Sequence, residues 1–98
     1  MVNTVAIILS ENTTVDQFTC FYAPKIQTAM GHPHTHFIFS DRHPFVARYL
    51  SQQRFRSCTI YHAGNTPKHT IGGYQLQGGF TSYVEIDEAL REAADEII

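Results

Sequence analysis

The sequence is poor in cysteine, with only Cys20 and Cys58 in 98 residues. Two cysteines that lie far apart are too few for the disulfide scaffold of a small secreted protein. Each lies in an apolar run, where cysteine usually packs as a small hydrophobic residue. We therefore expect two packed free thiols in a protein of a reducing compartment.

Long hydrophobic runs are also missing. No segment reaches the roughly 18 apolar residues of a transmembrane helix. The first ten residues lack the basic start and the cleavage pattern of a signal peptide. We therefore expect a cytoplasmic protein that does not contact a membrane.

The sequence has no strong charge of either sign, since the net charge is -2. A neutral-to-acidic chain lacks the basic surface that binds a nucleic acid backbone, so nucleic acid is not an expected partner. The charges are nevertheless segregated. Residues 42–68 hold five basic side chains and no acid, whereas six of the nine acids fall in the last fourteen residues. The basic middle favours a small phosphorylated ligand.

The length of the chain predicts one domain over residues 1–98, because about 100 residues build a single core. Apolar runs at residues 4–10, 36–40 and 57–62 predict buried strands, and residues 95–98 resemble the start of a fourth. Amphipathic spacing predicts helices over residues 15–30 and 44–53 and after residue 82. Residues 63–70 are interpreted as a loop. The expected helix caps are Asn12, Thr13 or Thr14, then Asp41, then Thr81 or Ser82.

Pro24 should kink or split the first helix, because proline removes a hydrogen-bond donor from a helix interior. The alternation of strands and helices predicts a small Rossmann-like three-layer α/β fold with a mostly parallel sheet of three or four strands. Such a small sheet has exposed edges, so we expect a homo-oligomer.

Polar residues follow the predicted strands, where a parallel α/β sheet binds its ligands. The candidates at these strand ends are Ser10, Asn12, Asp41, Arg42 and His62. Arg42 with His43, and Lys68 with His69, are cationic pairs that suit a phosphate. The open alternative is that these are solvated loop charges.

Two glycine pairs precede the last helix. Their backbone amides, together with a helix N-terminus, suit an anion such as a phosphate, and Tyr74 between the pairs is placed to stack on a base. The open alternative is a hairpin or tight turns before a capped helix. The ligand-binding candidates in this segment are Gly72, Gly73, Tyr74, Gly78, Gly79, Phe80, Thr81 and Ser82.

His32, His34 and His36 alternate, which in an extended strand would place three imidazoles on one face. Three histidines can bind zinc or nickel. Neighbours two residues apart diverge from a tetrahedral arrangement, however, and the sequence shows no clear fourth ligand. We interpret this segment as a polar loop and expect neither a metal nor another cofactor.

Residues 48–88 resemble part of the SLOG superfamily, the Rossmann-like domains related to the LOG phosphoribohydrolases. The resemblance lies in Tyr49 and Leu50 at a helix end, a strand over residues 58–61, Pro67 and Lys68 in a loop, and Gly72 and Gly73. Residues 78–85 are similar to the LOG signature G-G-x-G-T-x-x-E, in which Glu85 matches the glutamate. Thr81 replaces the third glycine and Ser82 replaces the threonine.

The resemblance implies a protein that binds a nucleotide-derived molecule, either ADP-ribose-like or a cyclic nucleotide signal. Thr81 departs from the signature, and the arginine-rich LOG motif has no counterpart, so we favour a sensor or sequestering protein over an enzyme. Some SLOG relatives act in immune signalling, which implies a role in antiviral signalling or its evasion. The alternatives are an enzyme that cleaves N-glycosidic bonds with Glu85 as its acid or base, and a phage or accessory protein-interaction module.

Overall fold

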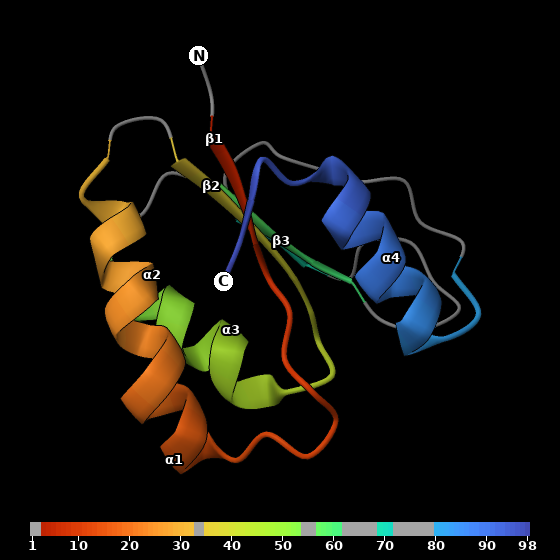
Figure 1. Ribbon diagram of the computed structural model, residues 1–98, viewed down its shortest axis with the longest axis horizontal. Helices are drawn as coiled ribbons and strands as arrows, with labels where there is room; N and C mark the ends of the chain where they lie inside the picture. Colours follow the sequence, from red (N-terminus) through yellow and green to blue (C-terminus); the bar gives the residue numbers. More distant parts are fainter. Residues whose placement is uncertain (1–2, 33–34, 54–56, 62–68, 72–79) are drawn as a thin grey trace.

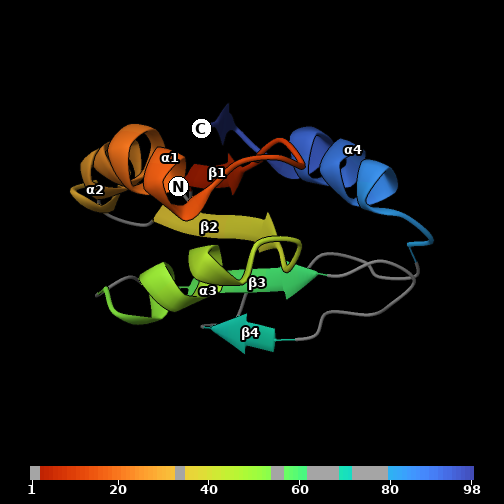
Figure 2. The same ribbon diagram turned by 90° about the horizontal axis from the view of Figure 1, so that it is seen from below.

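The computed structural model describes residues 3–32, 35–53, 57–61, 69–71 and 80–98. Five strands form one sheet in the order β4-β3-β2-β1-β5. Three parallel strands make its centre, and β5 extends it in parallel at one edge, whereas β4 is antiparallel to β3 at the other (Figure 2). The strands are β1 (Asn3–Ile7), β2 (Thr35–Ser40), β3 (Ser57–Tyr61), β4 (His69–Ile71) and β5 (Glu96–Ile97).

Helices cover both faces of the sheet. One continuous helical segment consists of α1 (Val15–Gln17), the π-helical turn η1 (Phe18–Tyr22) and α2 (Ala23–Met30). This segment and α3 (Pro44–Ser51) lie on one face, and α4 (Tyr83–Ala93) lies on the other (Figure 1). The chain is therefore a compact α/β domain, and the predicted three-layer fold with a mostly parallel sheet is confirmed.

The first helical segment begins with a reciprocal cap. Thr14 Oγ1 accepts a hydrogen bond from the Gln17 amide at 3.2 Å, and Gln17 Oε1 accepts one from the Thr14 amide at 3.0 Å. Just before Pro24, the Ala23 amide donates to the Phe18 carbonyl, five residues earlier. A wider turn at this point lets the helix continue past a proline that has no N–H to donate. The predicted irregularity at Pro24 is therefore confirmed, in the form of a π-helical turn.

The alternation of side chains along β1 and β2 builds two cores of unequal size. On the face of α1 to α3, the larger core contains Val5, Ile7, Leu9, Phe18, Ile26, Ala29, Phe37, Phe39, Val46 and Leu50. On the opposite face, the buried cluster is Ala6, Ile38, Ile86 and Leu90. The attachment of α4 therefore depends mainly on two of its own side chains, Ile86 and Leu90.

The last residues pair with the first strand. The Asp95 amide donates to the Thr4 carbonyl at 2.8 Å, and the Ile98 amide donates to the Ala6 carbonyl at 2.9 Å. The Thr4 amide in turn donates to Asp95 Oδ2 at 2.9 Å. The prediction that residues 95–98 start a further strand is confirmed.

The expectations for residues 69–70 and for Cys20 were wrong. His69 and Thr70, which were assigned to a loop, belong to β4, whose three residues are too few to show a periodic pattern. Cys20 is exposed, because it lies in the π-helical turn on the side away from the core. Its thiol is free, as expected, but it is not packed among apolar residues.

Candidate ligand site at the carboxyl edge of the sheet

The segment after β1 forms a turn closed by its own hydrogen bonds. The Thr13 amide donates to the Ser10 carbonyl at 3.1 Å, and the hydroxyl oxygens of these two residues lie 2.8 Å apart. Ser10 and Asn12, both predicted as ligand contacts, are exposed at this edge. Their side chains are accessible, but the Thr13 amide is already paired within the turn.

The segment after β2 is joined to α4. The Tyr83 hydroxyl donates to Asp41 Oδ1 at 3.0 Å. The Arg42 guanidinium lies over the Tyr83 ring, 4.8 Å from its centroid, and 3.9 Å from Asp87 Oδ2. Because Tyr83 and Asp87 lie one helical turn apart, they reach the end of β2 from the same side of α4. This group of Asp41, Arg42, Tyr83 and Asp87 is called the edge cluster below.

Asp41 does not cap α3, so that prediction was wrong. Pro44 is the first residue of α3, and His43 occupies the N-cap position without a side-chain cap hydrogen bond. Asp41 lies two residues before the cap and bonds to α4 instead.

His43 and Arg42 diverge, although the sequence suggested that they act as a pair. His43 is buried, its Nε2 lies 3.3 Å from the Glu11 carbonyl oxygen, and its ring centroid lies 5.2 Å from that of Phe45. Arg42 instead contacts α4, on the opposite face of the sheet. Arg42 is therefore the more accessible side chain of the two.

The edge cluster shifts the pKa values of two α4 side chains. Burial raises the pKa of the Tyr83 phenol, and the hydrogen bond to Asp41 raises it further. Burial also raises the pKa of Asp87, although the neighbouring Arg42 opposes this. At neutral pH Tyr83 is therefore a proton donor to Asp41, and the ion pair of Asp87 with Arg42 does not fully offset the loss of water around Asp87.

Glu85 contacts the residues before α4. Its carboxylate accepts hydrogen bonds from the Thr81 amide at 2.8 Å and from the Thr81 hydroxyl at 2.9 Å. Ser82, one of the two predicted candidates, is the N-cap, and its hydroxyl accepts a hydrogen bond from the Glu85 amide at 3.3 Å. The two bonds from Thr81 lower the pKa of Glu85. This carboxylate can accept a proton or stabilise a positive charge, but at neutral pH it has no proton to donate.

Phe80, the other described candidate of this segment, is half-buried and packs against the α4 core. The remaining predicted contacts lie outside the described residues: His62, Lys68, Gly72, Gly73, Tyr74, Gly78 and Gly79. Sequence reasoning missed Asp87, which was counted among the acids of the last fourteen residues. Its position four residues after Tyr83 was the available signal.

The alternating histidines are described only in part, since His34 lies outside the described residues. His32 follows α2 and is exposed, and His36 lies in β2. Among the residues that the structure describes, no three His, Cys, Asp or Glu side chains come together in a way that could hold a metal ion. Within the same residues, no helix has the length and apolar character needed to cross a membrane.

Comparison with known proteins gives no assignment. Neither the family models, nor the curated proteins, nor the solved structures contain a significant match to this chain. The function proposed below therefore rests on the geometry of the edge cluster and on the resemblance of residues 48–88.

Proposed function

We propose that this protein is a cytoplasmic, Rossmann-like sensor or sequestering protein of the SLOG type. Its proposed ligand is a nucleotide-derived molecule, such as ADP-ribose or a cyclic nucleotide signal. The observation that carries the proposal is the position of Asp41, directly after β2 and hydrogen-bonded by Tyr83.

The strand order of the sheet supports a ligand-binding role for the position of Asp41. From β1 the sheet continues in one direction through β2 and β3, and in the other direction to β5. Open α/β sheets bind ligands outside the carboxyl ends of the strands where the order reverses in this way. In dinucleotide-binding folds an acidic side chain near this edge accepts hydrogen bonds from a ribose hydroxyl. Asp41 has both the chemistry and the strand position for that contact.

The phosphate is assigned to Arg42. Its nearest approach to Asp87 is 3.9 Å, which is longer than a hydrogen-bonded ion pair, and both side chains are partly exposed. A phosphate oxygen could therefore replace Asp87 as the partner of Arg42 with little loss of free energy. At the N-terminus of α1, by contrast, the reciprocal cap already uses the Thr14 and Gln17 amides. The part of the glycine pairs in holding phosphate rests on sequence alone.

Calorimetric titration with ADP-ribose and with its 2′-deoxy analogue on the adenosine ribose tests this assignment. We expect ADP-ribose to bind, and Asp41→Asn to weaken its binding about tenfold or more, since a hydrogen bond to a charged group contributes about 1.5 to 3 kcal/mol. The deoxy analogue should bind the unaltered protein about as weakly as ADP-ribose binds the variant. Asp16→Asn is the matched control, because Asp16 is an exposed acid in the first turn of α1, and it should leave the affinity for ADP-ribose unchanged. Failure of ADP-ribose and of cyclic nucleotides to bind would refute the proposal.

The ionised state of Glu85 favours one second candidate, cleavage of an N-glycosidic bond, because a carboxylate can activate water or stabilise a cationic sugar. Incubation with nucleoside monophosphates tests it. Sustained release of free base that Glu85→Gln abolishes would replace binding by catalysis as the function. If neither ligand binding nor release of base occurs, an interaction module of phage or accessory type becomes the better proposal.

Among the described strands, β4 and β5 form the two edges of a small sheet, and an edge strand can pair with a second copy of the chain. The proposal therefore includes a homo-oligomer. Light scattering coupled to size-exclusion chromatography measures the mass directly. A monomer of about 11.1 kDa at all concentrations would contradict this part of the proposal without affecting the ligand site.

A further inference from the structure

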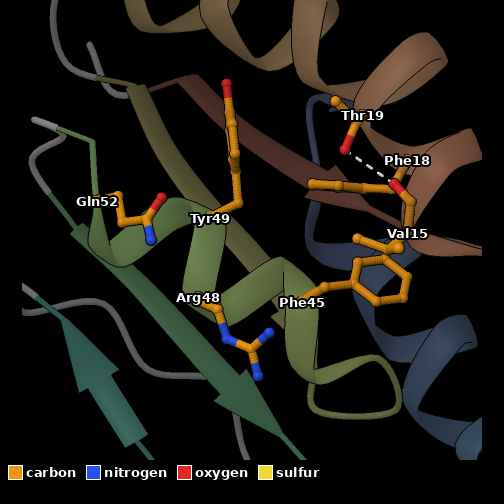
Figure 3. A pocket seen from close by; sticks show the side chains of 7 residues that line it. All are labelled: Val15, Phe18, Thr19, Phe45, Arg48, Tyr49 and Gln52. Carbon is orange, nitrogen blue, oxygen red and sulfur yellow. Dashed lines mark hydrogen bonds between the residues drawn. The ribbon is translucent and has the colours of Figure 1, made fainter.

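A cavity of about 150 Å³ lies between the first helical segment and α3, on the helical layer and not at the carboxyl edge. Figure 3 shows its side chains around a common space. They come from α1 and η1 on one side and from α3 and its C-cap on the other. The lining residues are Val15, Phe18, Thr19, Phe45, Arg48, Tyr49 and Gln52.

The apolar walls are fixed before any ligand arrives. Phe18 is 1% exposed, and its ring centroid lies 5.2 Å from that of Phe45 and 5.5 Å from that of Tyr49. The Tyr49 hydroxyl accepts a hydrogen bond from Gln27 Nε2 at 2.6 Å, which restrains the ring from its polar end. A cavity of this size with such walls accepts a benzene-sized ring.

The polar side chains of the wall differ in what they can offer. The Thr19 hydroxyl donates to the Val15 carbonyl at 2.9 Å within the helix, so its proton is already used. Among the described residues that line the cavity, Arg48 is the only charged side chain, and within the described chain no ion pair engages it. A guanidinium beside an apolar wall pairs best with a planar anion, which it binds through two parallel hydrogen bonds.

The π-helical turn contributes directly to this cavity, since Phe18 and Thr19 are its first two residues. A π-helical turn disrupts regular helical hydrogen bonding and recurs at functional sites in proteins. From the walls, the volume and the lone cation, we propose that this cavity binds a small aromatic carboxylate, with its ring against Phe18, Phe45 and Tyr49 and its carboxylate on Arg48. This site is separate from the edge cluster and does not depend on the function proposed for it.

Amide chemical shifts during titration with phenylacetate test the proposal. We expect saturable shifts at Val15, Thr19, Arg48 and Gln52, and a dissociation constant raised about fivefold or more in Arg48→Gln. Arg48 is exposed on α3, so its replacement leaves the core intact. Arg91→Gln removes the same charge from the last turn of α4, on the opposite face, and should leave the affinity unchanged.

Benzylamine keeps the ring and reverses the charge, so it should bind far more weakly than phenylacetate. Three outcomes would overturn the proposal: no saturable shift at these residues, equal binding by Arg48→Gln, or equal binding of benzylamine. The proposal would be supported if phenylacetate binds and if its affinity falls in Arg48→Gln but not in Arg91→Gln.

Discussion

Replacement of Leu90 by alanine tests how α4 is attached to the sheet. Leu90 is fully buried in the small core with Ala6, Ile38 and Ile86. The change removes three carbon atoms, and at about 0.8 kcal/mol for each buried methylene the transfer cost is about 2.4 kcal/mol. The cavity that remains raises the expected loss to about 3 to 5 kcal/mol. A domain of this length has a total stability of about 5 to 15 kcal/mol, so the variant should be severely destabilised.

The loss is measured by urea unfolding followed by circular dichroism, with thermal unfolding as a second measurement. For a domain of this size, each kcal/mol lowers the Tm by about 4 to 8 °C, which predicts a fall of about 12 °C or more. Val84→Ala is the matched control, because Val84 lies on the same helix but is 62% exposed, and alanine is the better helix former. A loss below about 1 kcal/mol for Leu90→Ala, or an equal loss for Val84→Ala, would refute the packing argument for α4.

Four further predictions concern caps and charges. Thr14→Ala should cost about 1 kcal/mol of unfolding free energy in urea, because it removes the acceptor for the Gln17 amide; an unchanged value would refute this role of the cap. Glu85 has a lowered pKa, so the stability that it adds is present above its unfolded pKa and is lost as the pH falls through its folded pKa. Asp87 has a raised pKa and should therefore cost stability once it ionises. Compared with the unaltered protein, Glu85→Gln should thus have a lower Tm at pH 7 but the same Tm at pH 2. Asp87→Asn should have a Tm that is higher, relative to the unaltered protein, at pH 7 than at pH 2. The opposite trends would contradict these assignments. In Asp41→Asn the pKa of the Tyr83 phenol should fall towards its ordinary value, as measured by NMR titration of the labelled ring, and an unchanged pKa would contradict the hydrogen bond.

The local patterns of the sequence were sufficient for the main elements. Apolar runs predicted β1, β2 and β3, because strands covered on both faces need side chains that are apolar at nearly every position. The short polar side chains that precede apolar-periodic segments narrowed the N-caps to a few neighbouring candidates, and Thr14 and Ser82 are among them. These strands and caps are determined by residues that are close together in the sequence.

The edge cluster was only partly predictable, because its contacts are long-range. Asp41 resembled a helix cap in sequence, but its partner Tyr83 lies 42 residues further along the chain. Arg42 was identified as a candidate, whereas Asp87, the acid with which it forms an ion pair, was not. A single sequence shows which side chains can form such bonds but not which elements bring them together. The assignments at the glycine pairs stay predictions, because those residues lie outside the described part.

The pairing of β5 with β1 also has a consequence for biosynthesis. Residues 3–7 leave the ribosome well before residues 95–98, so one edge of their strand stays open until residues 95–98 have been made. During translation this edge is a template that a neighbouring nascent chain could occupy by mistake. A delay in synthesis just before residues 95–98 should therefore prolong the exposure of this edge and favour aggregation.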